Sequence, residues 1–338
     1  MARFLDLNEE LANLVTARLG FADLCSLRQT SRECYEKTFR QFALRVRNLS
    51  FLVAKRSLDT LLSIAKHDRL GKAVKTVRLS SYYLNDSAYD MFDMDLHLAK
   101  TSEERRMIKT REKRYKAMLR KQEAFAGNSK AVESLRTVLS KLLNLEEIEI
   151  GEWYCERFSY RTERPFGLIE GGGDLKSLYT QNALIQVKEN EVLGLQNTFT
   201  VALRALMTHV KPINSLSAHC WDGDNPIKMS HISAKELAHA IPIVGYSGFR
   251  IALQGLRSLS LAVSFFEDDQ TGDDTSWRTW LPKFVSLPSQ LENLSLTLMA
   301  GAGTTLESVL GPMEPRSACL STTYSSHTSR SWSLCILS

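Results

Sequence analysis

The sequence has no long uninterrupted apolar run and no closely paired cysteines. Its longest apolar region, 241–261, is interrupted by Gly, Ser and Gln residues and by Arg250 and Arg257, so we expect no membrane-spanning helix. The six cysteines include no C-x-x-C pair and follow no regular spacing, and the first residues lack the apolar run of a signal peptide. These absences predict a reduced, intracellular protein in the cytoplasm, the nucleus or both.

Residue types that carry catalysis or bind metals are present, but not in the required constellations. The glycine run 171–173 lacks the Lys-Ser or Lys-Thr that follows a phosphate-binding loop. The acidic run 222–225 begins like a calcium loop, but Ser233 stands where a bidentate Glu is needed. His219 and Cys220 are adjacent, so in a strand their side chains would point to opposite faces. We therefore predict a protein that is not an enzyme, with no cofactor and no metal.

Positive charge is concentrated in one segment. The net charge is +5, and residues 100–121 hold ten Lys or Arg against three Glu, so the rest of the chain is close to neutral. With few apolar residues and several Glu-Lys pairs, this segment predicts a mostly solvated helix. Tyr115 is its only aromatic residue, whereas proteins that bind single-stranded DNA or RNA stack the bases on several aromatic rings. We therefore do not expect nucleic acid to be a partner.

Three short helices are predicted in the first 45 residues. Leu11, Leu14, Val15 and Leu19 recur with helical spacing, with Asn8 or Asp6 as the cap and Gly20 as the end of the helix. A second helix is expected from Asp23. The run 30–33 has the form of a capping box ahead of a third helix that carries aromatic residues. A unit of this size buries too little surface to fold well alone, so it needs a neighbour.

These residues resemble the F-box, the adaptor-docking motif of cullin-RING ubiquitin ligases. The family pattern runs Leu-Pro-x-Glu-Leu, an aliphatic residue, a Leu, Asp-Leu and then Ser-Arg or Cys-Arg. The resemblance implies adaptor-binding roles for a set of residues in this unit. They are Leu7, Asn8, Glu10, Leu11, Val15, Leu19, Leu24, Leu27, Ser31 and Arg32, with Asn8 at the position where the family prefers Pro. Ordinary amphipathic helices at the edge of a larger domain are the alternative.

A strand pattern of the form L-x-x-L-x-L recurs six times after residue 70. Its spacing is irregular, and a helical pattern precedes most copies, as at 131–143 and 234–240. A helical pattern over 49–70 precedes the first copy and is expected to stop at Gly71. The copies are Val74/Val77/Leu79, Leu145/Ile148/Ile150, Leu175/Leu178/Thr180, Ile213/Leu216/Ala218, Leu256/Leu259/Leu261 and Leu291/Leu294/Leu296.

The recurrence resembles an irregular leucine-rich-repeat array, in which each unit adds a parallel strand and a helical return. The usual Asn after each strand is absent, and a generic α/β sheet remains the alternative. The fold class predicted is α/β: an F-box-like unit over 1–45, and a leucine-rich-repeat-like domain over 46–310 with the charged insertion 100–121. The Ser-rich segment 311–338 is expected to be disordered, as a truncated or mis-spliced repeat.

Aromatic residues follow several of the predicted strands. Because parallel strands point the same way, residues just past their ends gather along one rim of the sheet. Tyr and Trp dominate binding hot spots, so we predict a substrate-binding rim. A satellite core under the loops is the alternative. The rim residues are Tyr82, Tyr83, Trp153, Tyr154, Trp221 and Phe265. The acidic run 267–269 with Asp273 and Asp274 is expected to be solvated, or else to contact a basic segment of a target.

The combination of an F-box-like unit, a charged helix and irregular repeats resembles F-box proteins of filamentous fungi. That resemblance implies a substrate receptor that binds a Skp-family adaptor and, through it, cullin and RING subunits, and that captures an unknown protein substrate. The alternative is a repeat-type interaction scaffold outside any ligase, with the basic helix on RNA or on an anionic surface. An enzyme with an unrecognised site is a third class.

Overall fold

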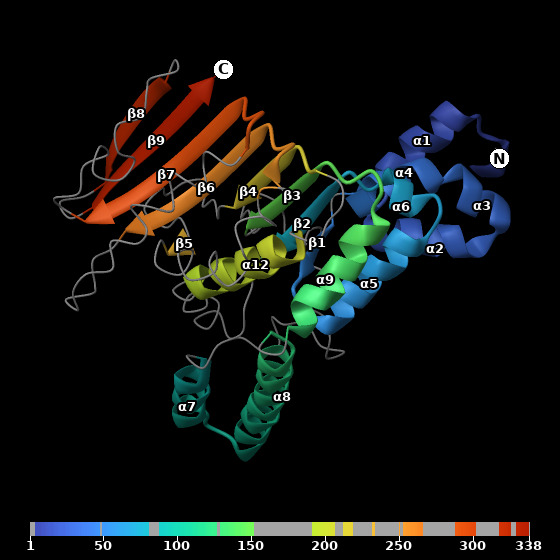
Figure 1. Ribbon diagram of the computed structural model, residues 1–338. Helices are drawn as coiled ribbons and strands as arrows, with labels where there is room; N and C mark the ends of the chain where they lie inside the picture. Colours follow the sequence, from blue (N-terminus) through green and yellow to red (C-terminus); the bar gives the residue numbers. More distant parts are fainter. Residues whose placement is uncertain are drawn as a thin grey trace.

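The structure is an α/β fold in which helices pack on a mainly parallel sheet (Figure 1). It is a computed structural model. It describes residues 4–47, 49–80, 88–126, 129–151, 191–206, 212–218, 232–233, 250, 253–265, 288–301, 318–325 and 329–337. The N-terminal helices lie at one end of the sheet, beside β1, and the C-terminal strands form the other end.

The elements follow in chain order. The helices are η1 (Phe4–Asp6), α1 (Glu9–Ala17), α2 (Phe21–Thr30), α3 (Arg32–Lys37), α4 (Phe39–Arg47), α5 (Lys55–Lys66), α6 (Leu70–Ala73), α7 (Ala88–Leu98), α8 (Ser102–Ala126), α9 (Lys130–Lys141) and α12 (Glu191–Leu206). The strands are β1 (Ser50–Leu52), β2 (Thr76–Ser80), β3 (Glu147–Gly151), β4 (Ser215–Ala218), β5 (Ile232–Ser233), β6 (Ser258–Phe265), β7 (Asn293–Gly301), β8 (Ala318–Ser325) and β9 (Ser329–Leu337).

Five of the six predicted strand patterns form β2, β3, β4, β6 and β7. These strands lie side by side in that order, all parallel, in a sheet of order β1-β2-β3-β4-β6-β7-β9-β8. Corresponding apolar positions are aligned in register, as in the row Val77, Ile148, Leu216, Leu259 and Leu294. The pattern at 175–180 lies outside the described residues.

The entries to β3, β4, β6 and β7 repeat the same backbone contact. The carbonyl oxygen of Lys75 accepts hydrogen bonds from the N–H groups of Glu146 and Glu147, at 2.8 and 3.0 Å. The carbonyls of Glu146, Asn214 and Arg257 each accept two N–H groups from the next strand entry in the same way. One carbonyl therefore satisfies two donors at each step, and this fixes the register between neighbouring strands.

The core lies between the sheet and the helices α5, α9 and α12, which run along one face (Figure 1). Side chains alternate along a strand, so the core rows are apolar while the other face carries polar residues. On that other face, Arg78 Nε lies 2.6 Å from Glu149 Oε2 of the neighbouring strand. The helical stretch predicted for 131–143 is confirmed as α9, whereas the one predicted for 234–240 lies outside the described residues.

The prediction of one continuous helix over 49–70 is wrong. The chain first forms the short strand β1, which pairs with β2, and only then enters α5. Gly71 does not stop that helix, because α5 has already ended and Gly71 lies inside α6. A Cβ atom at Gly71 would lie 2.3 Å from the carbonyl oxygen of Ala65, so the glycine permits the close packing of α6 on the end of α5.

The C-terminal segment differs from the expected disorder. Residues 318–325 and 329–337 form β8 and β9, an antiparallel pair, and β9 also pairs antiparallel with β7 from Asn293 to Gly301. The Ser and Thr residues that suggested disorder are also compatible with a strand, because Thr and the neighbouring Tyr and Trp residues favour extended backbone. Pairing of β9 satisfies the backbone groups along the edge of β7.

Among the residues that the structure describes, no helix is both long enough and apolar enough to cross a membrane. The same residues include no group of three or more His, Cys, Asp or Glu residues that could hold a metal ion.

Candidate functional site

The first helix carries an exposed apolar stripe. Asn8 is its N-cap, as predicted, and the side-chain oxygen of Asn8 accepts a hydrogen bond from the N–H of Leu11 at 2.9 Å. Leu11, Leu14 and Val15 keep 49%, 64% and 44% of their surface exposed. The face of α1 that packs inward instead carries the small residues Ala12 and Thr16, both fully buried. The helix therefore turns its larger apolar side chains to solvent.

The other residues predicted to bind an adaptor fall into three groups. Asn8, Glu10, Ser31 and Arg32 are exposed like the stripe, and Leu7, Leu19 and Leu27 are half-buried. Leu24 is fully buried in the structure, and its predicted role in adaptor binding stays a prediction. Leu24 supplies part of the core that holds the short helices together.

The expected third helix is divided in two. Ser31, not Thr30, is the N-cap of α3, and its hydroxyl accepts a hydrogen bond from the N–H of Cys34 at 3.1 Å. The helix then stops at Thr38, whose hydroxyl donates to the carbonyl of Cys34 at 2.7 Å, and α4 begins at Phe39. The N-terminal unit thus contains four helices after η1, where three were predicted.

Arg28 is the buried centre of this unit. Its Nη1 donates to the carbonyl of Tyr35 at 3.1 Å and to the hydroxyl of Thr38 at 3.2 Å. Its guanidinium carbon lies 4.0 Å from the ring centroids of both Tyr35 and Phe42, in cation–π geometry. Burial lowers the pKa of the Arg28 guanidinium. Burial also raises the pKa of the nearby Cys25 thiol, and the positive charge of Arg28 partly offsets that rise. One cation therefore joins α2, α3 and α4.

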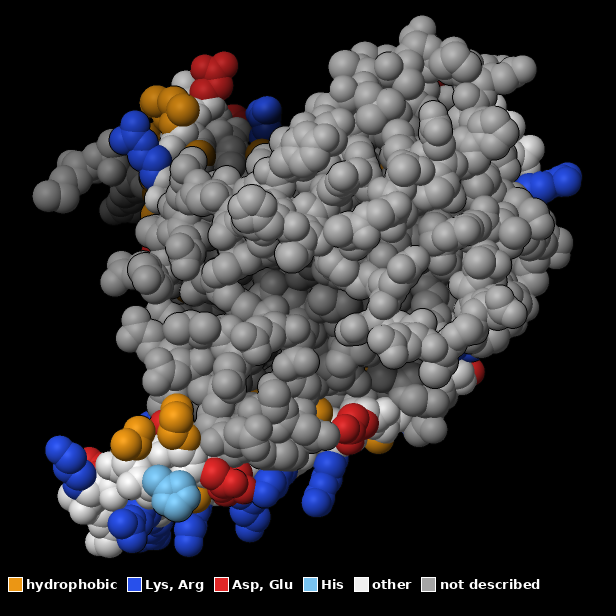
Figure 2. All heavy atoms as spheres, turned by 90° about the vertical axis from the view of Figure 1, so that its left-hand side faces the viewer, with side chains coloured by type: hydrophobic (Ala, Val, Ile, Leu, Met, Phe, Trp, Pro, Cys, Tyr) orange, Lys and Arg blue, Asp and Glu red, His pale blue; other side chains and the backbone are white. Residues whose placement is uncertain are grey.

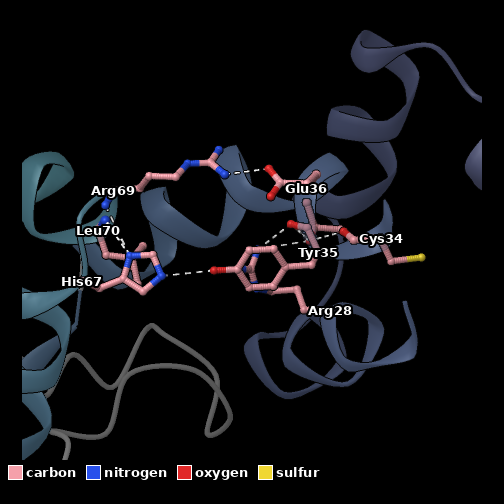
Figure 3. A network of polar contacts seen from close by, with 8 residues as sticks. Arg28, Cys34, Tyr35, Glu36, His67, Arg69 and Leu70 are labelled. Carbon is pink, nitrogen blue, oxygen red and sulfur yellow. Dashed lines mark hydrogen bonds and ion pairs between the residues drawn. The ribbon is translucent and has the colours of Figure 1, made fainter. Parts of the chain in front are cut away.

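A second polar network joins the N-terminal unit to the segment after α5 (Figure 3). The Tyr35 hydroxyl lies 3.1 Å from Nε2 of His67, and Arg69 Nη1 lies 2.6 Å from Glu36 Oε2. The guanidinium of Arg69 also lies 3.6 Å from the ring centroid of Phe39. Contacts of α3 and α4 with the α5–α6 junction therefore fix how the exposed stripe is oriented relative to the sheet.

The charged segment forms the helix α8, which packs against α7 and stands away from the sheet (Figure 1). Figure 2 shows Lys and Arg side chains gathered along this lower edge of the molecule, with some Asp and Glu side chains among them. The helix is not solvated all round, because Tyr115 and Leu119 are buried. The predicted Glu-Lys pairing is present between Glu112 and Lys116.

The predicted substrate-binding rim lies almost wholly outside the described residues. Tyr82, Tyr83, Trp153, Tyr154 and Trp221 belong to segments that the structure does not describe. Phe265 is the last residue of β6, where its backbone is in register with Ala300. Because β2, β3, β4 and β6 are parallel, their carboxyl ends do lie at one edge of the sheet. The binding role of that rim stays a prediction.

Three features of the N-terminal unit were missed in the sequence. Leu44 of α4 is as exposed as Val15, although α4 neighbours α1. Leu14 has the same exposure pattern and helical spacing as Leu11, so spacing alone could have included it in the docking set. The anchoring role of Arg28 had no sequence signal, because a lone Arg is usually solvated.

Comparisons with models of protein families, with curated proteins and with solved structures find no match for this chain.

Proposed function

We propose that this protein is an F-box-type substrate receptor of a cullin-RING ubiquitin ligase. The N-terminal helices would dock a Skp-family adaptor, and the α/β domain would hold the protein substrate. The chain itself would supply proximity and orientation, while an E2 enzyme brought by the RING subunit transfers ubiquitin. Under this proposal the receptor needs no catalytic group of its own.

The observation that carries the proposal is the exposed stripe of Leu11, Leu14 and Val15 on α1. A soluble protein gains stability by burying such side chains, so three of them exposed at helical spacing favour a surface that a partner covers. The surrounding sequence has the spacing of the adaptor-docking motif. The stripe is also held firmly, because the N-cap of α1 and the hydrogen bonds of Arg45 Nη2 to the carbonyls of Ala17 and Leu19 fix both ends of α1.

The finer description of the α/β domain as leucine-rich-repeat-like belongs to the same proposal. Its support is the repeated strand entry, in which one carbonyl accepts two N–H groups, and the aligned rows of apolar residues. Neighbouring units bury each other's apolar faces in such arrays. A substrate would then bind along the sheet, at a place that the rim hypothesis puts at the carboxyl ends of the strands.

The test measures adaptor binding by the full-length chain. The double variant Leu11→Asp/Val15→Asp is compared with wild type by titration calorimetry against a purified Skp-family adaptor. Two buried aliphatic side chains contribute about 3 kcal/mol or more, so we expect the affinity to fall by about 100-fold or more. The thermal transition of the α/β domain should not change, since both residues are exposed.

A matched control uses exposed apolar residues on other elements. Leu98→Asp/Leu143→Asp makes the same change in charge and hydrophobicity at positions that are exposed on α7 and after α9. It should bind the adaptor as wild type does. Wild-type binding that is absent, or that survives in the α1 variant, would contradict the proposal and favour a scaffold outside any ligase.

A further inference from the structure

A row of basic side chains lies along the outer face of α8. Arg106, Lys113 and Arg120 are spaced by seven residues, so they lie about two helical turns, or about 10 Å, apart. Lys109 lies one turn from Arg106 on the same side. All four side chains are exposed, and none forms an ion pair with another residue that the structure describes. We call these four residues the basic row.

The other face of α8 is anchored, so the basic row is held in place. The rings of Tyr115 and Phe92 of α7 lie 5.7 Å apart, and Tyr115 is fully buried. Near the C-terminal end of α8, Phe125 joins the core beneath the sheet. At the N-terminal end, Glu104 accepts hydrogen bonds from the N–H groups of Lys100 and Thr101 at 2.8 and 3.0 Å. The backbone that carries the row is therefore preorganised, and binding orders only its side chains.

Three other cations of α8 already interact with residues of α8, of α7 or of the turn between them. Lys116 pairs with Glu112, and the charge of Arg111 acts on Asp95 of α7, opposing the burial that raises the pKa of that carboxyl. Arg105 donates from Nε to the carbonyl of Ala99 at 3.4 Å. The four residues of the basic row have no such partner among the described residues, and the same holds for the exposed Arg114 and Lys121 next to the row.

Carboxylates border the row on one side, because Glu112 and Glu123 lie beyond Lys109 around the helix. On the other side, Glu103 shares the surface with the exposed cations Arg114 and Lys121. A nucleic-acid duplex, whose major groove alone is about 12 Å wide, would bring phosphates against Glu112 and Glu123. A narrow anionic ligand could follow the row and avoid them.

Two other anionic ligands fit less well. Single-stranded nucleic acid is bound by stacking on aromatic rings, and Tyr115 of α8 is fully buried. A membrane surface is bound by helices whose free face is apolar, whereas the apolar residues Tyr115 and Leu119 of α8 face inward. What remains is an acidic stretch of polypeptide.

We propose that the basic row of Arg106, Lys109, Lys113 and Arg120 binds an extended acidic segment of a partner protein. A segment in the polyproline II conformation has three residues per turn and rises about 3.1 Å per residue, so every third side chain lies on one face, at about the 10 Å spacing of the row. The whole row spans about 21 Å, the length of about seven extended residues. This surface is separate from α1, and the proposal does not depend on adaptor docking.

The test uses the full-length chain and a fluorescein-labelled peptide of about ten residues, with Glu at every third position and Ser or Gly elsewhere. Anisotropy is measured at low salt and at about 0.15 M salt, where exposed charges are screened beyond about 8 Å. Replacing all four residues of the row by Gln should lower the affinity by about tenfold or more, because four exposed ion pairs are lost.

The control replaces Arg56, Lys66, Arg136 and Lys141 by Gln. These residues are two Arg and two Lys exposed on α5 and α9, so net charge falls equally, and the affinity should change less than about threefold. A peptide of the same composition with its Glu residues at one end should bind more weakly. Circular dichroism checks that both variants keep their helices.

Three results would overturn the proposal. The first is no binding of the spaced peptide to wild type even at low salt. The second is an equal loss in the two variants, which would reduce the effect to net charge. The third is tighter binding, through the same four residues, of an RNA duplex or of phosphatidylserine vesicles than of the peptide.

Discussion

The hydroxyl of Tyr35 in α3 lies 3.1 Å from Nε2 of His67, at the end of α5 (Figure 3). Nδ1 of the same imidazole accepts the N–H groups of Arg69 and Leu70, both at 3.3 Å. A neutral imidazole has one donor and one acceptor nitrogen, so Nε2 carries the proton and donates to the tyrosine oxygen. This histidine therefore links the N-terminal helices to the start of α6 in one defined tautomer.

The first prediction concerns this link. Tyr35→Phe removes the hydroxyl and should lower the free energy of unfolding by about 1 kcal/mol, the usual net value of such a hydrogen bond. His67→Ala should cost more, because it also leaves two backbone N–H groups without their acceptor. A double-mutant cycle measured by urea denaturation should give a coupling energy of about 1 kcal/mol between the two side chains. Fully additive effects would contradict the link.

The second prediction concerns Arg28, which holds three helices together. Arg28→Lys keeps the charge but loses the planar group that stacks on Tyr35 and Phe42 and donates to Thr38. We expect it to destabilise the N-terminal unit by about 2–3 kcal/mol, since buried donors and cation–π contacts are lost together. Arg40→Lys, at an exposed position of α4, is the control and should be neutral within about 0.5 kcal/mol.

The strands were largely predictable from the sequence, and the reason is local. Val77, Ile148, Leu216, Leu259 and Leu294 sit at the same place in each short apolar pattern, and backbone pairing aligns them in the structure. The parallel order of the strands followed from repeating one unit along the chain. The helices α7 and α12 were not predicted, although Phe199, Ala202, Leu203 and Leu206 do have helical spacing.

The orientation of α1 could not be predicted in the same way. Helical spacing identified Leu11, Leu14 and Val15 as one face, but spacing does not say whether that face meets a core or solvent. In the structure, Ala12 and Thr16 fit against the other helices, where leucines would be too large for the close approach. The burial of Leu24 was not predicted either. A motif gives positions in a pattern, whereas burial depends on packing between helices that the pattern does not contain.

The third prediction is a pH effect at the start of α8. Hydrogen bonds from the N–H groups of Thr101 and Lys100 lower the pKa of Glu104 from its ordinary value of 4.5. A lowered folded-state pKa means that the cap is fully formed above the ordinary value, and that it is lost as pH falls through the folded-state pKa. Amide exchange at Lys100 and Thr101, followed by NMR, should therefore stay slow at pH 4.5 and quicken only below it.

Glu104→Gln is the matched variant for this pH effect. It keeps a side-chain oxygen as acceptor but has no titrating group, so exchange at Lys100 and Thr101 should lose its pH step in this range, after correction for intrinsic rates. Glu103→Gln changes the neighbouring exposed carboxylate, which makes no cap contact, and should keep the step. A step that survives in Glu104→Gln would show that another group titrates.

The last prediction separates the observed C-terminal pairing from the disorder expected from the sequence. Truncation after residue 312 removes β8 and β9 and leaves β7 as an edge of nine residues, Asn293–Gly301. An unpaired edge of that length presents free N–H and C=O groups to another chain, so the truncated protein should self-associate as its concentration rises. Light scattering measures this association.

A milder variant, Ser333→Pro, keeps the segment but removes one N–H from β9, where Ser333 is opposite both Thr297 and Ser321. It should expose β7 to a smaller extent than the truncation does, because one backbone hydrogen-bonding position of β9 is lost and the other positions can still pair. If the segment is disordered, both changes leave the protein monomeric with an unchanged thermal transition, and the pairing of β9 with β7 is wrong.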